Sequence, residues 1–133
     1  MKNYLCLLIL TVFVFTSCAS DDEADIDYAA AVVGTYVGEY SEEDNSGSAS
    51  IDDVVTTVER ESSNEISVNM NLFLAQLNFN ATMVDGTSFI VDEFTFFDYQ
   101  LSGEGLLDGD ELTIELIEVN DPELIISFVG QVE

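Results

Sequence analysis

Hydrophobic and polar side chains alternate with a period of two over most of the chain after Ile26. The clearest run covers residues 65–74, in which every second residue is apolar: Ile66, Val68, Met70, Leu72 and Leu74. This alternation predicts β-strands with one buried face. Helical spacing is found only at residues 27–33, which predict a single turn closing one end of the fold.

Turn-forming residues divide the first half of the predicted sheet. Residues 34–40 form a first strand, and the polar segment 42–50 is expected to be a loop. Strands at 54–61 and 65–74 are joined by a short serine-rich turn. A further hairpin is expected to join strands at 77–84 and 87–91 through a turn at Asp85 and Gly86. Pairing the strands about this turn sets Phe79 opposite Asp92.

The strongest hairpin signal is Asp108-Gly109, a favoured two-residue turn. Folding about it pairs Gly105 with Leu112 and Gly103 with Ile114. One face then holds Leu101, Gly103, Gly105, Leu112, Ile114 and Leu116. The other face holds Gln100, Ser102, Glu104, Glu111, Thr113 and Glu115. The two glycines predict a sharply bent strand, and a strand at residues 124–132 completes a three-stranded meander.

An aromatic group interrupts the alternation in the second half of the chain: Phe94, Phe96, Phe97 and Tyr99. This shift of phase predicts a β-bulge or a sheet corner. About eight strands with short connections can bury their edges only by curling, so the predicted fold is all-β, a small antiparallel meander β-barrel or sandwich.

The composition is strongly acidic. Asp and Glu together number 27, against one Lys and one Arg, and the formal net charge is −25. Such a charge repels phosphate, so nucleic acid is not an expected partner. Histidine is absent, and Cys6 and Cys18 are the two cysteines. Histidine-based triads and zinc sites are therefore not expected, nor is a dedicated metal site at the Asp108–Glu111 turn. The sequence predicts a protein that is not an enzyme.

The first residues have the pattern of an export signal. Lys2 precedes an apolar run at residues 4–15, which is shorter than the roughly 20 residues that span a bilayer. Phe15, Thr16, Ser17 and Cys18 follow, and this segment resembles the lipobox of bacterial lipoproteins, although Phe15 stands where leucine is usual. The resemblance implies cleavage after Ser17 and a diacylglyceryl group on Cys18. The alternatives are an ordinary signal with an incidental cysteine, or a Cys6–Cys18 disulfide, which removal of the signal would exclude.

The sequence after Cys18 is a short acidic tract, Ala19 to Asp25, which is typical of a solvated tether. It resembles the export tract that sends lipoproteins of Bacteroidetes type to the outer face of the outer membrane, and a plain linker is the alternative. The expected organisation is a signal peptide at 1–17, a lipidated cysteine and acidic tether at 18–30, and a barrel-like domain at 31–133. No cofactor is expected beyond the lipid.

The folded part resembles the small lipocalin-like (calycin-like) lipoproteins of Bacteroidetes type. The resemblance rests on GTYVGEY at 34–40, SGEGLLDGDELTIEL at 102–116 and ISFVGQVE at 126–133. It covers most of the chain after the signal. These motifs are structural, and the family largely lacks an assigned activity, so the resemblance implies a fold and no functional residue.

The candidate ligand pocket consists of aromatic residues: Tyr36, Tyr40, Phe94, Phe96, Phe97 and Tyr99. The same side chains would otherwise fill the barrel, which is the usual arrangement in small barrels. Arg60 is the second candidate site, either for an anionic ligand or, as the favoured interpretation, for an ion pair with a carboxylate of a neighbouring strand.

Two functions remain open from the sequence. The first is an outer-membrane, surface-displayed lipoprotein that acts as a non-catalytic interaction or envelope module, which predicts a filled core and an exposed apolar patch. The alternative is a lipid-tethered, lipocalin-like binding module for a small apolar or saccharide ligand, which predicts an empty aromatic cavity. The expected partners are the membrane, through the lipid, and an unknown protein or small ligand.

Overall fold

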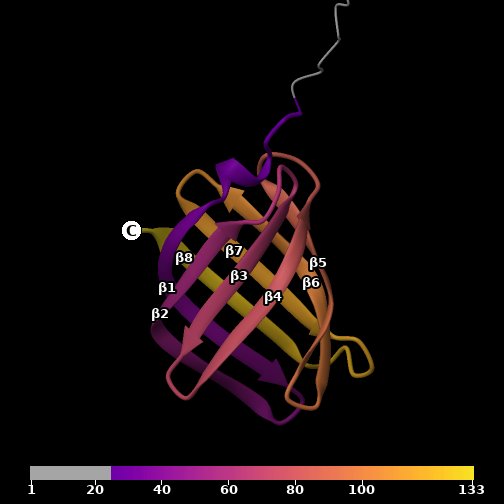
Figure 1. The fold of residues 1–133 in the computed structure, drawn as a ribbon. Coiled ribbons are helices and arrows are strands. Elements are labelled where there is room, and N and C mark those ends of the chain that lie inside the picture. The colour runs from indigo at the N-terminus through magenta and orange to yellow at the C-terminus, as the bar shows by residue number, and fades with distance from the viewer. Residues whose placement is uncertain (1–24) are drawn as a thin grey trace, which may run out of the picture.

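The computed structural model describes residues 25–133, so the expected signal peptide and Cys18 lie outside the described residues. A short 3-10 helix, η1 (Ala29–Ala31), precedes eight strands. These are β1 (Gly34–Asp44), β2 (Gly47–Arg60), β3 (Glu65–Leu72), β4 (Ala75–Met83), β5 (Ser88–Phe96), β6 (Tyr99–Asp108), β7 (Glu111–Glu118) and β8 (Ile125–Val132). The strands form a closed antiparallel barrel in sequence order, with β8 pairing back to β1 (Figure 1). The prediction of an eight-strand meander is confirmed.

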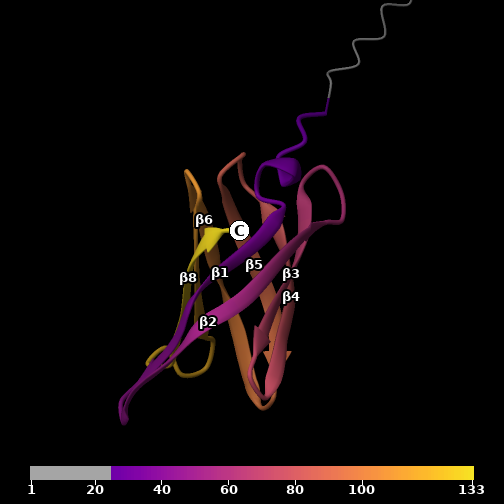
Figure 2. The same cartoon turned by 90° about the vertical axis from the view of Figure 1, so that its left-hand side faces the viewer.

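The two ends of the barrel differ. The β2–β3, β4–β5 and β6–β7 connections lie at the end where η1 packs, here called the η1 end (Figures 1 and 2). The β1–β2, β3–β4, β5–β6 and β7–β8 connections lie at the opposite end, here called the open end. The described chain therefore enters the barrel at the η1 end. Among residues 25–133, no helix has the length and apolarity needed to cross a membrane.

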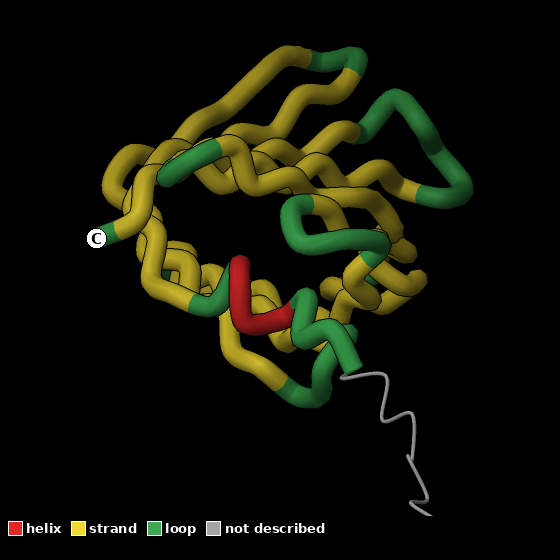
Figure 3. Tube along the Cα trace, turned by 90° about the horizontal axis from the view of Figure 1, so that it is seen from above, coloured by secondary structure: helices red, strands yellow, loops and turns green. Residues whose placement is uncertain are grey.

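The helix η1 closes its end of the barrel, as the sequence predicted for residues 27–33. Ala29 and Val32 are fully buried. The Ala29 amide donates a hydrogen bond to the Ser63 carbonyl at 3.0 Å, and the Tyr36 hydroxyl donates to the Val32 carbonyl at 2.9 Å. Seen end-on, η1 lies at the rim and extends over part of the barrel opening (Figure 3). These contacts join the start of the domain to β1 and to the β2–β3 turn.

Arg60 forms an ion pair, which was the favoured interpretation of this residue. Its partner is Asp27 in the segment before η1, with Nε and Oδ2 2.9 Å apart. Asp27 also accepts a hydrogen bond from the Ala30 amide at 3.2 Å. The expected partner was a carboxylate on a neighbouring strand. The observed partner lies before η1 instead, because η1 folds back over the end of β2.

The barrel interior is filled by side chains from all around the sheet. The largest fully buried residues include Phe89, Phe128, Ile66, Met70, Leu77, Leu101, Leu112, Ile114 and Leu116. Neighbouring atoms approach closely at the two β6 glycines, where a sharply bent strand was predicted. A β-carbon on Gly105 would overlap the Phe89 ring, and one on Gly103 would overlap the Glu115 carbonyl. Bare backbone at these positions lets the sheet bend tightly around its core.

The predicted faces of the β6–β7 hairpin are correct, but its register is wrong by two residues. Gly105 pairs with Ile114 and Gly103 with Leu116. The two-residue loop is Gly109-Asp110, and Gly109 has a φ of +64°. This geometry fits a turn that needs positive φ at its first central residue, where glycine adopts it without strain. A shift of two residues leaves every side chain on its predicted face.

The predicted polar loop at 42–50 is wrong, because β1 and β2 continue through it as one long hairpin. Glu43 pairs with Ser48 and Asp44 with Gly47. The Asp44 carboxylate accepts hydrogen bonds from the Ser46 amide at 2.7 Å and the Gly47 amide at 3.1 Å. A hydrogen bond from the Ser46 hydroxyl, together with these amide bonds, lowers the pKa of Asp44. The outer part of β2, residues 47–53, has no pairing with β3, so neither of its faces needs apolar residues.

The β4–β5 register also differs from the prediction, by one residue. Ala81 pairs with Val91, and a four-residue loop runs from Val84 to Thr87. The Asp85 carboxylate accepts bonds from the Thr87 and Ser88 amides, both at 2.8 Å, and these bonds lower the pKa of Asp85 to about 2. A one-residue shift exchanges the faces of a strand, and this one sets buried Ala81 opposite buried Val91.

Two bulges change which side chains face the interior. In β5 an extra residue lies between Val91 and Phe94, which confirms the bulge predicted from the aromatic phase shift. In β2 the register shifts between Ile51 and Val54, where Asp53 has a φ of +58°. Aspartate tolerates this conformation better than most residues. The β2 bulge turns Ile51 toward the open end of the barrel.

Candidate functional site

The open end of the barrel carries an apolar depression of about 470 Å³, here called the mouth. It is lined by Tyr40, Glu42, Ile51, Leu72, Phe73, Leu74, Ala75, Phe96 and Phe97. These residues come from β1, from the part of β2 that precedes its bulge, and from the β3–β4 and β5–β6 turns with the strand ends beside them. The lining is almost entirely carbon, with the exception of the Tyr40 hydroxyl and the Glu42 carboxylate. The mouth can therefore contact apolar groups of a partner or ligand.

Three side chains at the mouth project far into solvent. Phe73 is 89% exposed and Leu74 92% exposed in the β3–β4 turn, and Phe97 is 72% exposed in the β5–β6 turn. The prediction that Leu74 ends a strand on its buried face is wrong, because β3 ends at Leu72. The apolar positions change from even to odd numbers between Leu74 and Leu77, and this change of phase is the sequence signal for the turn.

The backbone of Phe97 is strained. Its φ is +51°, in the left-handed region that is rare for a residue with a β-carbon. Positive φ at a non-glycine residue costs about 1–3 kcal/mol and concentrates at functional sites. The ring of Phe97 packs against Phe96, with centroids 4.5 Å apart, and most of its surface remains in water. The fold therefore holds an exposed aromatic ring at a position where glycine would be easier.

Tyr40 forms the polar part of the mouth. Its side chain is buried, and its hydroxyl donates a hydrogen bond to the Glu42 carboxylate. Burial first, and then the bond and charge of Glu42, raise the pKa of Tyr40 above its usual value. Tyr40 therefore stays protonated at neutral pH and acts as a neutral donor.

The structure distributes the six aromatic residues of the predicted pocket among several places. Tyr40, Phe96 and Phe97 come together at the mouth. Tyr36 lies near η1, where burial and then the charge of Asp110 raise its pKa. Phe94 lies on the side wall, and Tyr99 is half-exposed after the β5–β6 turn.

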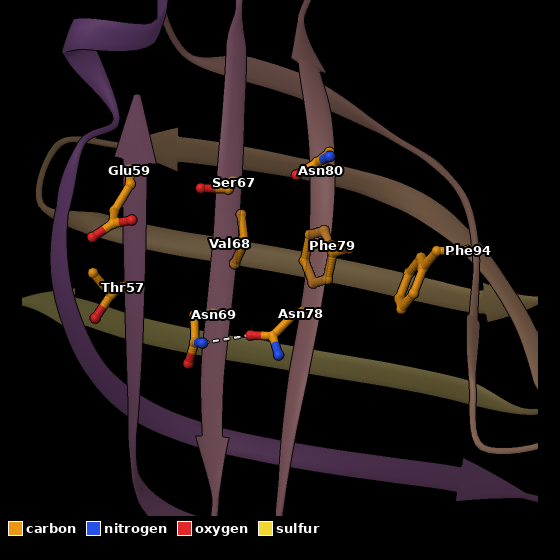
Figure 4. A pocket seen from close by; sticks show the side chains of 9 residues that line it. All are labelled: Thr57, Glu59, Ser67, Val68, Asn69, Asn78, Phe79, Asn80 and Phe94. Carbon is orange, nitrogen blue, oxygen red and sulfur yellow. Dashed lines mark hydrogen bonds between the residues drawn. The ribbon is translucent and has the colours of Figure 1, made fainter. Parts of the chain in front are cut away.

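A second depression, of about 380 Å³, lies on the side wall and is here called the side groove (Figure 4). It is lined by Thr57, Glu59, Ser67, Val68, Asn69, Asn78, Phe79, Asn80 and Phe94. The Asn69 amide donates a hydrogen bond to the Asn78 side-chain oxygen across β3 and β4. The Phe79 and Phe94 rings stack with centroids 5.2 Å apart and planes at 28°. The groove thus joins amide groups to one apolar wall.

Two buried oxygens have no hydrogen-bond partner within the described residues, Thr56 Oγ1 and Glu118 Oε2. Glu118 is on the inward face of β7, in line with Leu112, Ile114 and Leu116. Its other oxygen accepts a bond from the Asn120 side chain at 3.4 Å. The burial of Glu118 could not be predicted from the sequence, because a glutamate at the end of a strand is usually solvated.

The carboxylates around the β6–β7 turn are exposed to solvent. Glu104, Asp108, Asp110 and Glu111 are all exposed around the β6–β7 turn. Within residues 25–133, no group of three or more His, Cys, Asp and Glu side chains is placed to hold a metal ion. The concave surfaces with apolar lining, rather than the carboxylates, are the candidate sites.

Comparison with known proteins gives similarity at the level of fold. No protein family and no curated protein matches the sequence. A redesigned β-barrel aligns with a TM-score of 0.56 at 10% identity, over 80% of this chain and 96% of its own. A candidate outer membrane protein of Bacteroides fragilis aligns with a TM-score of 0.55 at 16% identity, over 81% of this chain and 53% of its own.

Transferrin binding protein B of Actinobacillus pleuropneumoniae, a vaccine antigen solved as a point mutant, aligns with a TM-score of 0.55. Its identity is 13%, and the alignment covers 76% of this chain and 61% of that one. The chain thus spans little more than half the length of these two natural proteins. At these identities the similarity establishes a shared eight-strand barrel architecture.

Proposed function

We propose that this chain is a lipid-anchored, surface-displayed module of the outer membrane that has no catalytic activity and contacts a partner protein through its mouth. The observation that carries the proposal is the trio of exposed apolar side chains at the open end: Phe73, Leu74 and Phe97. An exposed apolar patch of this kind is typical of an interaction site. The filled interior also fits this function better than a ligand carrier.

The position of the mouth agrees with an anchor before the barrel. The described chain enters at η1, and the β3–β4 and β5–β6 turns, which carry much of the mouth, lie at the opposite end (Figure 1). A lipid on Cys18 would therefore hold the η1 end nearer the membrane and direct the mouth away from it. The two natural barrel neighbours, one a candidate outer membrane protein and the other transferrin binding protein B, support the same setting by analogy of fold.

Lipidation and display are tested first by intact mass and protease shaving. We expect protein extracted from membranes with detergent to have the mass of residues 18–133 plus a diacylglyceryl group. We also expect protease added to whole cells to remove the barrel. An unlipidated soluble product would contradict the anchor, and a lipidated domain that resists shaving in cells but not after lysis would contradict surface display.

Contact through the mouth is tested by site-specific photo-crosslinking in intact cells. We expect p-benzoylphenylalanine in place of Phe73 or Leu74 to give the same discrete adduct on irradiation. The matched control places the crosslinker at Val129, which is also half-exposed and apolar but lies on β8 and does not line the mouth. Adducts of equal yield and identity from all three positions would show nonspecific contact and contradict the proposal.

The strain at Phe97 predicts that its replacement by glycine weakens partner contact without lowering the stability of the fold. We expect Phe97→Gly to leave the free energy of unfolding unchanged or to raise it by about 1 kcal/mol, because relief of left-handed strain slightly exceeds the cost of a flexible glycine. The crosslinked adduct should weaken in the same variant. Urea denaturation measures the first effect, and a clear loss of stability would show that the Phe97 ring serves the fold.

A second candidate function is capture of a small apolar ligand at the mouth, as the lipocalin-like resemblance would suggest. The observation in its favour is that a concave apolar surface surrounds the buried Tyr40 hydroxyl. The neutral dye N-phenyl-1-naphthylamine distinguishes the two functions. Fluorescence that saturates with one dye per chain and is lost in Phe97→Gly would favour ligand capture.

A further inference from the structure

The barrel has a weak seam between β4 and β5. These strands pair at only three positions, Ala81 with Val91, Thr82 with Ile90 and Met83 with Phe89. Toward the open end the two strands diverge (Figure 1). The pairing ends where the β5 bulge begins, because the extra residue between Val91 and Phe94 bends β5 away from its neighbour.

The seam leaves two strand edges without partners. Residues 75–80 of β4 pair with β3 on one side and with no strand on the other. Residues 92–96 of β5 likewise lack a partner on the side facing β4. Alternate amide and carbonyl groups along such an edge are free to bind another extended chain. In this barrel, stacking of Phe79 on Phe94 bridges the gap instead of main-chain bonds.

The surroundings of the seam are acidic. Asp92 and Glu93 are exposed at the bulge, and Glu59 lines the side groove. A neighbouring depression of about 330 Å³ also contains Asn80 of the groove wall and is lined by Glu61, Glu65 and Asp92. Arg60 offers no counter-charge at the seam, because its guanidinium binds Asp27. Carboxylates at an open edge oppose pairing with a second copy of a chain whose net charge is −25.

We propose that the seam is a docking site for an extended, basic peptide segment of a partner protein, which adds a strand to the free edge of β4. Main-chain hydrogen bonds to residues 75–80 would supply affinity, as in other cases of β-strand addition. One apolar side chain of the peptide would lie against Phe94, whose ring stacks on the buried Phe79, and lysine or arginine side chains would reach Asp92 and Glu93. This site is on the side wall, so it is additional to partner contact at the mouth.

The occupant follows from charge and geometry. A strand offers alternate side chains to opposite faces, so a segment that alternates basic and apolar residues matches both the carboxylates and the aromatic wall. The acidic tract before the barrel and a second copy of the chain both carry the wrong charge. A saccharide could use the Asn69, Asn78 and Asn80 amides, but it would leave the strand edge unpaired.

The test uses the full chain in neutral detergent and a labelled hexapeptide with three Lys-Val repeats and blocked ends. We expect saturable binding and slower hydrogen exchange at alternate amides of residues 75–80. A peptide of the same charge with alternate backbone amides N-methylated should bind at least about tenfold more weakly, because it cannot complete the ladder. Equal binding of the two peptides would overturn strand addition.

Charge-reversal variants separate the seam from general attraction to an acidic protein. We expect Asp92→Lys/Glu93→Lys to weaken peptide binding at least about tenfold more than Glu39→Lys/Glu43→Lys, which makes the same charge change on exposed β1 positions. Equal weakening would overturn the proposal, as would protection of the same amides by a neutral maltooligosaccharide but not by the peptide. Phe97→Gly should bind the peptide normally, so failure at the mouth remains distinguishable from failure at the seam.

Discussion

Gly105→Ala is expected to destabilise the barrel by about 3 kcal/mol, which lowers the midpoint of thermal unfolding by roughly 10–20 °C. A β-carbon at this position would overlap the ring of Phe89, which is almost completely buried. The ring has no free space to move into, because protein interiors are close-packed. The expected change is therefore at the high end for the addition of one methyl group, and urea denaturation of the full chain measures it.

A double-mutant cycle identifies the Phe89 ring as the cause. Phe89→Leu makes room beside Gly105, so the double variant should be more stable than the sum of the two single effects predicts, by at least about 1 kcal/mol. Gly86→Ala is the matched control, since its β-carbon would meet only the Tyr28 ring at 3.9 Å. Strict additivity at Gly105 and Phe89 would mean that the ring does not occupy this space.

Val32→Asp is expected to destabilise the barrel by about 4 kcal/mol or more at neutral pH, which is a large part of the stability of a typical domain. Val32 is fully buried beneath η1, where an ionised carboxylate has no water and no cationic partner within the described residues. Burial would raise the pKa of the introduced carboxyl in the folded chain above its unfolded value of about 3.9. The penalty is therefore smallest below that value, where only the neutral carboxyl is buried, and it grows as the pH rises toward the folded pKa.

The neighbouring residue provides the control for this prediction. Val33→Asp adds the same charge at a side chain that is 45% exposed, and it should change the free energy of unfolding by less than about 1 kcal/mol. Urea titrations of both variants at pH 4 and pH 7 compare them directly. Similar losses for the two variants at both pH values would show that η1 does not close this end of the barrel.

Several elements could be predicted because their signals are local. The inward face of β6 and β7 follows from the alternation at Leu101, Leu112, Ile114 and Leu116, all of which are buried. The turn at η1 and the β5 bulge were visible as breaks in that alternation. A strand with a period of two needs no knowledge of its partner to reveal which side chains are buried.

Register could not be predicted in the same way. The β6–β7 pairing depends on Gly109 rather than Asp108 taking the first central position of the turn, and both choices give identical faces. The hairpin at residues 42–50 has polar residues on both faces, so its pairing comes from main-chain bonds that leave no hydrophobic pattern.

The candidate sites depend on distant contacts. Tyr40, Ile51, Leu72 and Phe96 meet at the mouth because barrel closure joins β1 to β8 and a bulge re-aims Ile51. Phe79 and Phe94 meet because β4 and β5 part at another bulge. The sequence alone determined the all-β class, the buried faces and the closing turn, since these follow from local periodicity. The tertiary structure decided the registers, the mouth and the open seam, since these depend on which distant strands pair and where a bulge interrupts them.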